Sequence, residues 1–393
     1  MDTGTAYGRP APSYRRELTE VGPGTPMGEL LRRYWHPVGL ASDAGPVPKK
    51  VRVLGEDLIL FRDGAGRAGL LYPRCAHRGT TLYYGRVEER GIRCCSHVWL
   101  WDVEGHCLEQ PCEPGGGARR ERFRQPWYPV EERYGLVFAY MGPPEKKPVL
   151  PRYDCLEELA PGEFIEADDS SIGSGGPQIV PCNWLQHWEN VVDPFHVPIL
   201  HGAFSGAQFV PEMAAMPEVR FETTPRGVKV TSLRRREDGR VHRRVTEVVM
   251  PTLRVVPNPR LAKFGKVESI GWVLPMDDTH FRIYVAGRVT EKGELGRFRS
   301  KMAGKYWWEL SEEEHQRYPG DYEAQTGQGP ITFHSEEHFA TSDKGIALLR
   351  RFLEAQLRVV AEGGDPACVA FDEARALIRV EAGQTLLDPA QVS

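Results

Sequence analysis

The sequence predicts an α+β protein in which an N-terminal all-β domain precedes an α+β domain built on an antiparallel sheet. Three observations support this fold class. Residues 51–142 contain short β-rich runs, residues 219–289 alternate apolar and polar side chains after a Pro-rich linker, and residues 342–362 have the apolar spacing of one long amphipathic helix. Because such a helix normally packs across a sheet, we place it on the sheet of the second domain.

The composition narrows the class of protein. The 393 residues have a formal net charge of -4, with 40% hydrophobic and 26% charged residues, so no nucleic-acid partner is indicated. No apolar run reaches the roughly 18 residues of a membrane span. The start of the chain lacks the apolar region of a secretory signal, and eight cysteines are too few for a disulfide scaffold. We therefore expect a cytoplasmic protein with free or metal-bound thiols.

The order of the segments predicts the domain boundaries. Residues 1–26 are rich in Gly, Pro and charge and predict an N-terminal arm. Residues 27–150 form the β domain, which opens with a short helix and contains a hairpin whose connection is residues 63–66. The Pro-rich stretch around residue 150 has the composition of a linker, so residues 151–393 form the α+β domain.

The α+β domain begins with helices and ends with one. Residues 182–193 predict a helix that a proline ends, and residues 194–204 predict a turn and a second short helix. The strands of residues 219–289 carry several arginines, which we expect on a solvated face. In the last helix Ser342 is the expected cap and Gly363 the expected end. Its apolar stripe consists of Ile346, Leu349, Leu353, Leu357 and Val360.

Two Cys/His pairs, Cys75-x-His77 and Cys94-x-x-His97, lie at predicted turns between strands. Each pair mixes one sulfur with one nitrogen, whereas a zinc finger usually sets two cysteines together and two histidines together. A 2Fe-2S cluster with two thiolates on one iron and two imidazoles on the other explains the mixture, because each loop then gives one ligand to each iron. A structural zinc protein is the rival interpretation. We expect the other six cysteines in the core.

A second metal site is indicated by Asp193, His196 and His201. Two histidines and a carboxylate can hold Fe(II) and leave positions open for dioxygen and water. Pro198 breaks the helix between the histidines and permits their convergence. Two histidines satisfied in a core are an equally good interpretation of this segment alone.

The stretches CAHRGTTLYYGR and CCSHVWLWDVEGHC resemble the cluster loops of Rieske-type aromatic-ring oxygenase α subunits. The resemblance implies that Cys75, His77, Cys94 and His97 hold the cluster. The chain departs from the family pattern after Cys94, where Cys-Ser replaces the common Pro-Tyr, and at Val98, where the family commonly has Gly. These departures concern the tuning of the cluster potential and not its ligation.

The Asn-x-x-Asp-x-x-His-x-x-x-x-His stretch that ends at His201 resembles the iron-binding segment of the same family. There the aspartate bridges the cluster of one subunit and the iron of the next, so the resemblance gives that role to Asp193. Residues 321–331 resemble the phthalate-dioxygenase-like branch, which implies that Asp321 joins His196 and His201 as the third iron ligand. Asp343 is the rival, although its place in the first turn of a helix favours a structural role.

The resemblance implies a helix-grip, START-like catalytic domain in a terminal oxygenase. Electrons from NAD(P)H would leave a separate flavin/iron-sulfur reductase, pass through the 2Fe-2S Rieske cluster and reach a mononuclear Fe(II), where O2 reacts beside an aromatic small molecule. The absence of a nucleotide-binding GxGxxG motif after a strand agrees with a separate reductase. The branch also implies an α-only homotrimer or a multiple of it. The alternative function is a Rieske electron-transfer protein without oxygenase activity.

The sequence says less about the substrate. Residues 202–219 contain no Lys or Arg and predict either an apolar pocket wall or plain core. Their large apolar side chains are Phe204, Phe209, Met213 and Met216. A carboxylate on the substrate would need Arg243, Arg244 or Arg254, and the spacing selects none of them. Hydroxylation, dihydroxylation and oxidative demethylation share this machinery.

Overall fold

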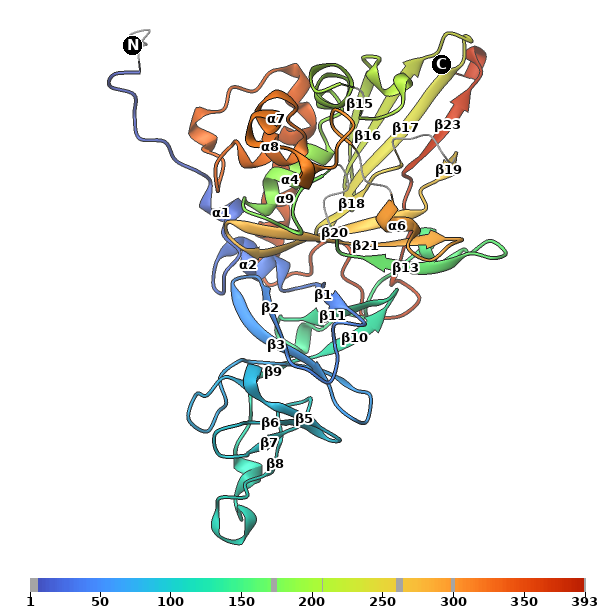
Figure 1. Cartoon of the computed structure of the whole chain (residues 1–393). Coiled ribbons are helices and arrows are strands. Elements are labelled where there is room, and N and C mark those ends of the chain that lie inside the picture. The colour runs from blue at the N-terminus through green and yellow to red at the C-terminus, as the bar shows by residue number, and fades with distance from the viewer. Residues whose placement is uncertain (1–5, 171–174, 207, 259–263, 298–300, 392–393) are drawn as a thin grey trace.

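The structure is a computed structural model that describes residues 6–170, 175–206, 208–258, 264–297 and 301–391. The molecule is elongated, with small β-sheets at one end and a large sheet with its helices at the other (Figure 1). None of the helices in the described ranges combines the length and apolarity needed to cross a membrane.

Three small antiparallel sheets form the β domain within the described residues. The first, in the order β1-β11-β10, contains β1 (Trp35–Leu40), β10 (Val130–Arg133) and β11 (Leu136–Tyr140). The second, in the order β2-β3-β4-β9, contains β2 (Lys49–Val53), β3 (Glu56–Arg62), β4 (Ala68–Leu71) and β9 (Trp127–Tyr128). The third, in the order β5-β6-β7-β8, contains β5 (Arg86–Glu88), β6 (Gly91–Arg93), β7 (Leu100–Trp101) and β8 (Cys107–Glu109). The predicted hairpin at residues 63–66 joins β3 to β4.

A curled antiparallel sheet of ten strands, counted over the described residues, forms the centre of the α+β domain. Its main path runs β13-β21-β20-β18-β17-β16-β15, and β14, β19 and β23 pair beside it. The strands are β13 (Phe164–Asp168), β14 (Ile179–Val180), β15 (Glu218–Thr224), β16 (Gly227–Arg235), β17 (Val241–Val249), β18 (Leu253–Val255), β19 (Gly265–Lys266), β20 (Ser269–Asp277), β21 (His280–Val289) and β23 (Gly383–Leu387). Two further strands, β12 (Arg152–Tyr153) and β22 (Leu377–Ile378), form a parallel pair.

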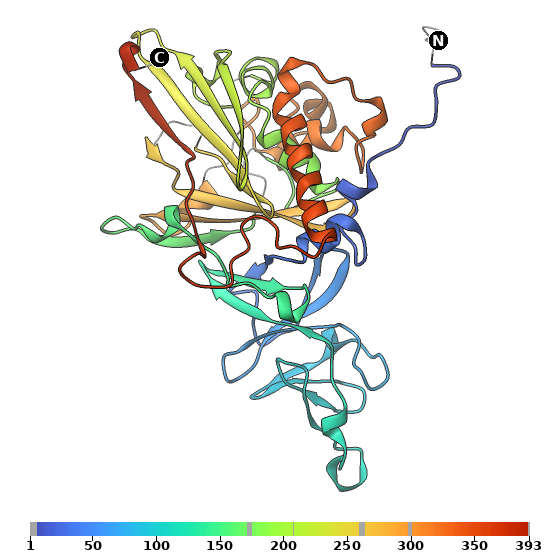
Figure 2. The same ribbon diagram turned by 180° about the vertical axis from the view of Figure 1, so that it is seen from behind.

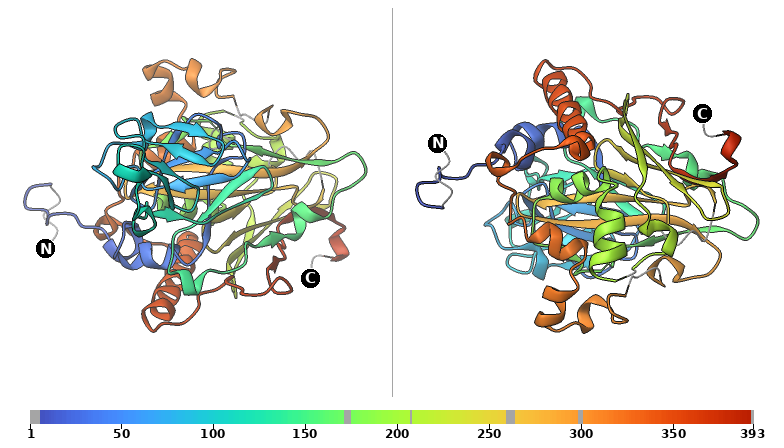
Figure 3. Two further views of the ribbon diagram at one scale, coloured as in Figure 1. Left: turned by 90° about the horizontal axis from the view of Figure 1, so that it is seen from below. Right: turned by 90° about the horizontal axis from the view of Figure 1, so that it is seen from above.

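Two longer helices cover this sheet. The helix α4 (Trp184–Val191) contacts β17, β20 and β21, and with the segment after it lies across the sheet when seen from above (Figure 3). The last long helix, α9 (Lys344–Ala361), packs against β15 and β16 (Figure 2). The shorter helices are α1 (Arg16–Thr19), α2 (Pro26–Leu31), α3 (Asp154–Glu157), α5 (His196–Pro198), α6 (Glu294–Arg297), α7 (Glu312–Arg317) and α8 (Asp321–Thr326). A π-helix, η5 (Ile199–Phe204), follows α5 directly.

The expected cap of α9 is wrong by one residue. The N-cap position is Asp343 and not Ser342, because residues 341–343 form a 3-10 turn before the helix. The Asp343 carboxylate accepts a hydrogen bond from the Ala340 N–H at 2.7 Å and so closes that turn. The apolar stripe is confirmed, with Leu349 and Leu353 fully buried.

Residues of the predicted arm pack on the main core. Leu18 and Val21 are fully buried, and α1 contacts α4 and α9. The same core continues through β1 and β11 into the large sheet, so the two domains share apolar contacts. A second, smaller core lies under the Cys/His loops and contains Phe61, Leu82 and Trp101.

Two sequence expectations about burial are wrong. Cys95 and Cys112 are exposed, although Cys107, Cys155 and Cys182 are buried as expected and Cys368 is half-buried. The arginines of the large sheet are not all solvated, since Arg234 and Arg244 are 2% and 7% exposed.

Candidate redox and metal sites

The two Cys/His loops bring like donors together. Cys75 and Cys94 are each 2% exposed, and burial, with the neighbouring Cys75, raises the pKa of the Cys94 thiol. The rings of His77 and His97 lie with their centroids 4.6 Å apart at 83°. Each loop thus gives one sulfur to a thiol pair and one ring to an imidazole pair. This is the donor arrangement of a 2Fe-2S cluster with two thiolates on one iron and two imidazoles on the other.

Aromatic side chains surround these donors. The Trp101 indole donates a hydrogen bond to Cys75 Sγ at 3.3 Å, and His77 stacks on Trp99 with 4.3 Å between the centroids and 6° between the planes. A hydrogen bond to a cluster sulfur stabilises the more negative, reduced state, so Trp101 would raise the potential of a cluster held by Cys75.

A buried glutamine holds the first loop. The Gln125 side chain accepts from the Ala76 N–H at 2.7 Å and donates to the carbonyls of Tyr72 and Arg74 at 2.7 and 2.9 Å. Gln125 itself is fully buried. Its amide therefore satisfies three backbone groups that the loop cannot pair elsewhere.

We expect Gln125→Met to destabilise the cluster domain by about 3 kcal/mol, because it leaves these three backbone groups unpaired. The measurement is thermal unfolding followed by the visible absorbance of the cluster. Gln110→Met is the matched control, since Gln110 is equally buried but its Nε2 has no hydrogen-bond partner among the described residues. Equal melting temperatures for the two variants would contradict the role given to Gln125.

The two loops turn in the same way four residues after each cysteine. The Gly79 N–H bonds to the Cys75 carbonyl at 2.8 Å, and the Val98 N–H bonds to the Cys94 carbonyl at 3.1 Å. Gly79 has φ of 80°, which suits glycine, but Val98 has φ of 55°. A left-handed conformation costs a β-branched residue about 1–2 kcal/mol, so the second loop is the more strained one.

An ion-pair network holds the strained turn. The Arg93 guanidinium donates to the Val98 carbonyl at 2.7 Å and pairs with Glu88 and Glu109, each at 2.7 Å. Arg93 holds the pKa of the Glu88 carboxyl at about 2. Cys95 faces solvent, so it is neither core nor an additional cluster donor.

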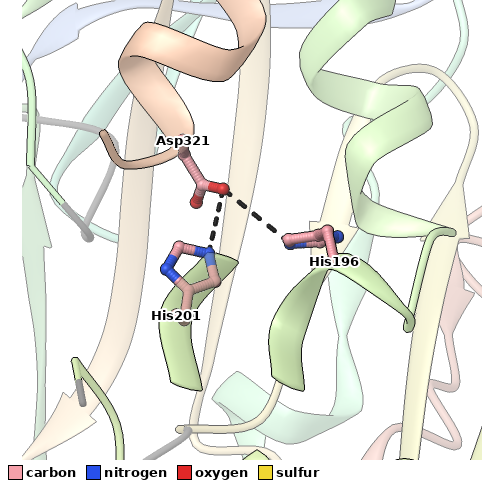
Figure 4. Close-up of side chains that lie close together, drawn as sticks. All are labelled: His196, His201 and Asp321. Carbon is pink, nitrogen blue, oxygen red and sulfur yellow. Dashed lines mark hydrogen bonds and ion pairs between the residues drawn. The ribbon is translucent and has the colours of Figure 1, made fainter. Parts of the chain in front are cut away.

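Three side chains converge in the catalytic domain: His196 on α5, His201 on η5 and Asp321 at the start of α8 (Figure 4). Their donor atoms lie within 4.8 Å of one another. Asp321 Oδ1 is 3.0 Å from His201 Nε2 and 3.8 Å from His196 Nε2. The wide π-helical turn that follows Pro198 lets residues five apart face the same point.

The outer ring nitrogens are held by neighbouring side chains. His201 Nδ1 lies 2.7 Å from Gln208 Oε1, and His196 Nδ1 lies 3.3 Å from Asp193 Oδ2. Both Nε2 atoms are thereby turned toward Asp321. Two imidazoles and one carboxylate with their outer nitrogens so oriented fit a divalent iron ion.

The Asp321 carboxylate also favours a positive charge between the three converging side chains. Burial lowers the pKa of His201, but the Asp321 carboxylate outweighs burial and raises the pKa above its usual value. Asn190 Nδ2 donates to Asp321 Oδ1 at 3.2 Å and orients that carboxylate. Asp343, the rival acid, lies instead at the start of α9.

Asp193 lies outside the three converging side chains, on the outer side of His196. Its Oδ1 accepts from the Phe195 N–H at 2.9 Å. Burial raises the pKa of the Asp193 carboxyl, but contact with His196 outweighs burial and the net pKa lies below the usual value. Asp193 is therefore an anion that touches the imidazole of a candidate ligand.

Other residues near this site were not predicted from sequence. Gln208 follows the π-helix, and no spacing rule points to it. His187 is 2% exposed and its Nδ1 lies 3.0 Å from Gln325 Oε1, while burial lowers its pKa to about 3. The predicted apolar pocket wall is only partly buried. The rings of Phe209 and His201 lie with their centroids 4.5 Å apart at 39°, but Phe204 is 67% exposed.

Comparison with known proteins gives a consistent result. A family model described as the Rieske [2Fe-2S] domain matches residues 34–128. The α subunit of phenoxybenzoate dioxygenase from Ectopseudomonas oleovorans is 55% identical over 388 residues, which cover 97% of this chain and 93% of that protein. The oxygenase subunit of phthalate 4,5-dioxygenase from Pseudomonas putida is 31% identical over 283 residues, 68% of this chain and 62% of that protein. The structure of NdmA with caffeine from Pseudomonas putida CBB5 shares the fold, with a TM-score of 0.62 at 19% identity over 86% of this chain and 94% of that one.

Proposed function

Because this chain belongs to the Rieske non-heme iron oxygenase α subunits, close to phenoxybenzoate dioxygenase and the phthalate-dioxygenase-like oxygenases, we propose that its two sites act in series to oxidise an aromatic compound with O2. The chain is the terminal oxygenase component of its system, and a separate reductase supplies the electrons. The 2Fe-2S cluster supplies one-electron transfer and the Fe(II) supplies the dioxygen chemistry.

The chain's own residues hold and orient these groups. Cys75, Cys94, His77 and His97 would hold the cluster, and the burial of both cysteine side chains keeps water away from their sulfurs. His196, His201 and Asp321 would hold the iron through two imidazoles and one carboxylate, a donor set that supports dioxygen chemistry. Gln208 fixes the tautomer of His201 by accepting from its Nδ1–H.

Asp193 is the residue through which we propose that the two sites communicate. Its anionic carboxylate contacts the outer nitrogen of His196 and can hold that ring and accept a proton as the charge of the iron site changes. In one chain the Cys/His loops and α8 lie at opposite ends of the molecule (Figure 1). This separation supports electron transfer between neighbouring subunits, and hence a homotrimer of this chain or a multiple of it.

An aromatic substrate and dioxygenation are supported by two relatives, phenoxybenzoate dioxygenase and phthalate 4,5-dioxygenase, both dioxygenases of aromatic acids. Hydroxylation and oxidative demethylation use the same residues and are the other outcomes. We also place the protein in the reducing cytoplasm, since none of the eight cysteines forms a disulfide.

The convergence of His196, His201 and Asp321 carries the proposal, because a simple electron carrier needs no such centre. The test is metal analysis of the purified protein before and after a ferrous chelator. We expect about three irons per chain, of which the chelator removes one together with turnover while the cluster absorbance stays. Two cluster irons without a chelatable third would favour the electron carrier, and a colourless zinc protein would refute both.

A further inference from the structure

Three arginines project from one face of the large sheet. On β16 and β17, Arg234 pairs directly with His242, and Arg244 follows His242 by two residues. On β18, Arg254 pairs with Val248, which lies four residues beyond Arg244 on β17. Because side chains alternate between the faces of a strand, these registers place Arg234, Arg244 and Arg254 on the same face.

Arg234 and Arg244 have polar neighbours, but none of the three arginines forms an ion pair with a carboxylate within the described part of the chain. Arg234 donates to the Ala215 carbonyl at 2.9 Å, and its Nη1 is buried without a partner among the described residues. Arg244 donates to Gln384 Oε1 at 3.2 Å. For the side chain of Arg254 the described residues provide neither a hydrogen bond nor a salt bridge.

Burial and the neighbouring charges lower the pKa of Arg244. Burial lowers its pKa to about 9, with further lowering by Arg234 and Arg254 that Glu268 only partly offsets. Burial lowers the pKa of Arg234 to about 10. A buried cation without an acid partner normally costs several kcal/mol, so three on one face require an explanation.

Arg254 lies on the side of this group toward the iron site. Its side chain crosses Gly271 on the neighbouring strand β20, where an added Cβ would lie 3.0 Å from Arg254 Cγ. Asp321 raises the pKa of Arg254, although burial lowers it overall, and Arg254 in turn lowers the pKa of His187 on α4. The Arg254 residue is only half-buried, so a ligand atom can reach it.

We propose that Arg254 and Arg244 bind the carboxylate of an aromatic acid substrate, with Arg254 setting its distance from the iron and Arg234 adding positive charge behind them. The inference rests on the proposed function and names its substrate class. A carboxylate accepts two parallel hydrogen bonds from a guanidinium and supplies the missing negative charge. Substrate binding would then place a negative charge beside the arginines of this face. Arg243, on the opposite face of β17, has no part in it.

The test is equilibrium dialysis of the iron-loaded protein with phenoxybenzoate and with phenoxybenzamide, its neutral analogue. We expect Arg254→Gln to weaken phenoxybenzoate binding roughly 100-fold, as for loss of one partner of a buried charge pair, and phenoxybenzamide binding less than about threefold. Arg244→Gln should act in the same direction, and Arg254→Lys should retain part of the affinity. Arg243→Gln is the matched control and should change neither ligand. Equal weakening of acid and amide, or an unchanged affinity for the acid, would overturn the proposal.

Unfolding without ligand separates a binding role from a structural one. Since Arg254→Gln removes an uncompensated buried cation, its melting temperature should equal or exceed that of the wild type, and a clear decrease would speak for a structural role. Charge-dependent binding of phenoxybenzoate without any oxygenated product would leave this site standing and refute the proposed function. Oxygenated product from neutral aromatics, with no preference for the acid, would refute this binding site and leave the proposed function standing.

Discussion

Asp321→Ala should lose the mononuclear iron and at least about 10³-fold in turnover, while the cluster and its visible spectrum remain. Asp321 is the one carboxylate among the three converging side chains, and its Oδ1 lies 3.0 Å from His201 Nε2. Removing it leaves two imidazoles, which hold Fe(II) weakly, and loss of the metal removes several kcal/mol of transition-state stabilisation. Iron analysis and product formation with a reductase measure the two effects.

Asp343→Ala is the control for this variant. Asp343 is the acid that competes with Asp321 on sequence grounds, and it closes a turn before α9 through the Ala340 N–H. We expect the Asp343→Ala protein to keep its iron and its activity. Its free energy of unfolding should fall by about 1 kcal/mol, as for a lost helix cap. If the Asp321→Ala protein keeps its iron and activity, Asp321 is not an iron ligand. If the Asp343→Ala protein loses its iron, Asp343 is the ligand instead.

Asp193→Asn should keep both metal centres and reduce turnover by about 10- to 100-fold. The amide retains the size of the carboxylate and can still accept from the Phe195 N–H. It lacks the negative charge that contacts His196 Nδ1 at 3.3 Å, and loss of such an outer partner of a metal ligand typically costs up to about 100-fold. The measurement is the rate at which the iron site oxidises the reduced cluster, followed by its absorbance.

A matched control exists on the β20–β21 turn. Asp277 contacts His280 at 3.0 Å with the same three-residue spacing, and it has no contact with the candidate iron ligands. Asp277→Asn should leave the rate of cluster oxidation unchanged. A normal rate in Asp193→Asn, or an equal decrease in both variants, would exclude the bridging role of Asp193.

Local patterns predicted much of the fold and of the site. The mixed Cys/His pairs and the Asp-x-x-His spacing are short-range signals, because each loop or helix sets the separation of its own donors. The long amphipathic α9 and the antiparallel sheet follow from periodicity alone. The family pattern, and not spacing, led to Asp321, which lies 120 residues after His201 and meets it only through the tertiary fold.

What the sequence left open depends on contacts between distant strands. The arginines of β16, β17 and β18 look like a solvated face until the register shows that they share a buried one. Gln125 is distant in sequence from the loop that it holds, and Gln208 has no spacing signature. Val98 was recognised as a departure, but its strained φ and its support by Arg93 are visible only in three dimensions.

We propose that electrons from the cluster drive O2 chemistry at the iron of this chain. The most direct measurement is a single turnover without reductase: protein with the cluster and iron reduced in advance is mixed with ¹⁸O-labelled O2 and a panel of aromatic acids, ethers and amines. We expect the cluster to be oxidised and at least one aromatic to be converted, either to a product that contains the label or, for an ether or amine, to the demethylated product with release of formaldehyde. Oxidation of the cluster with neither a labelled nor a demethylated product from any member of the panel would contradict this proposal.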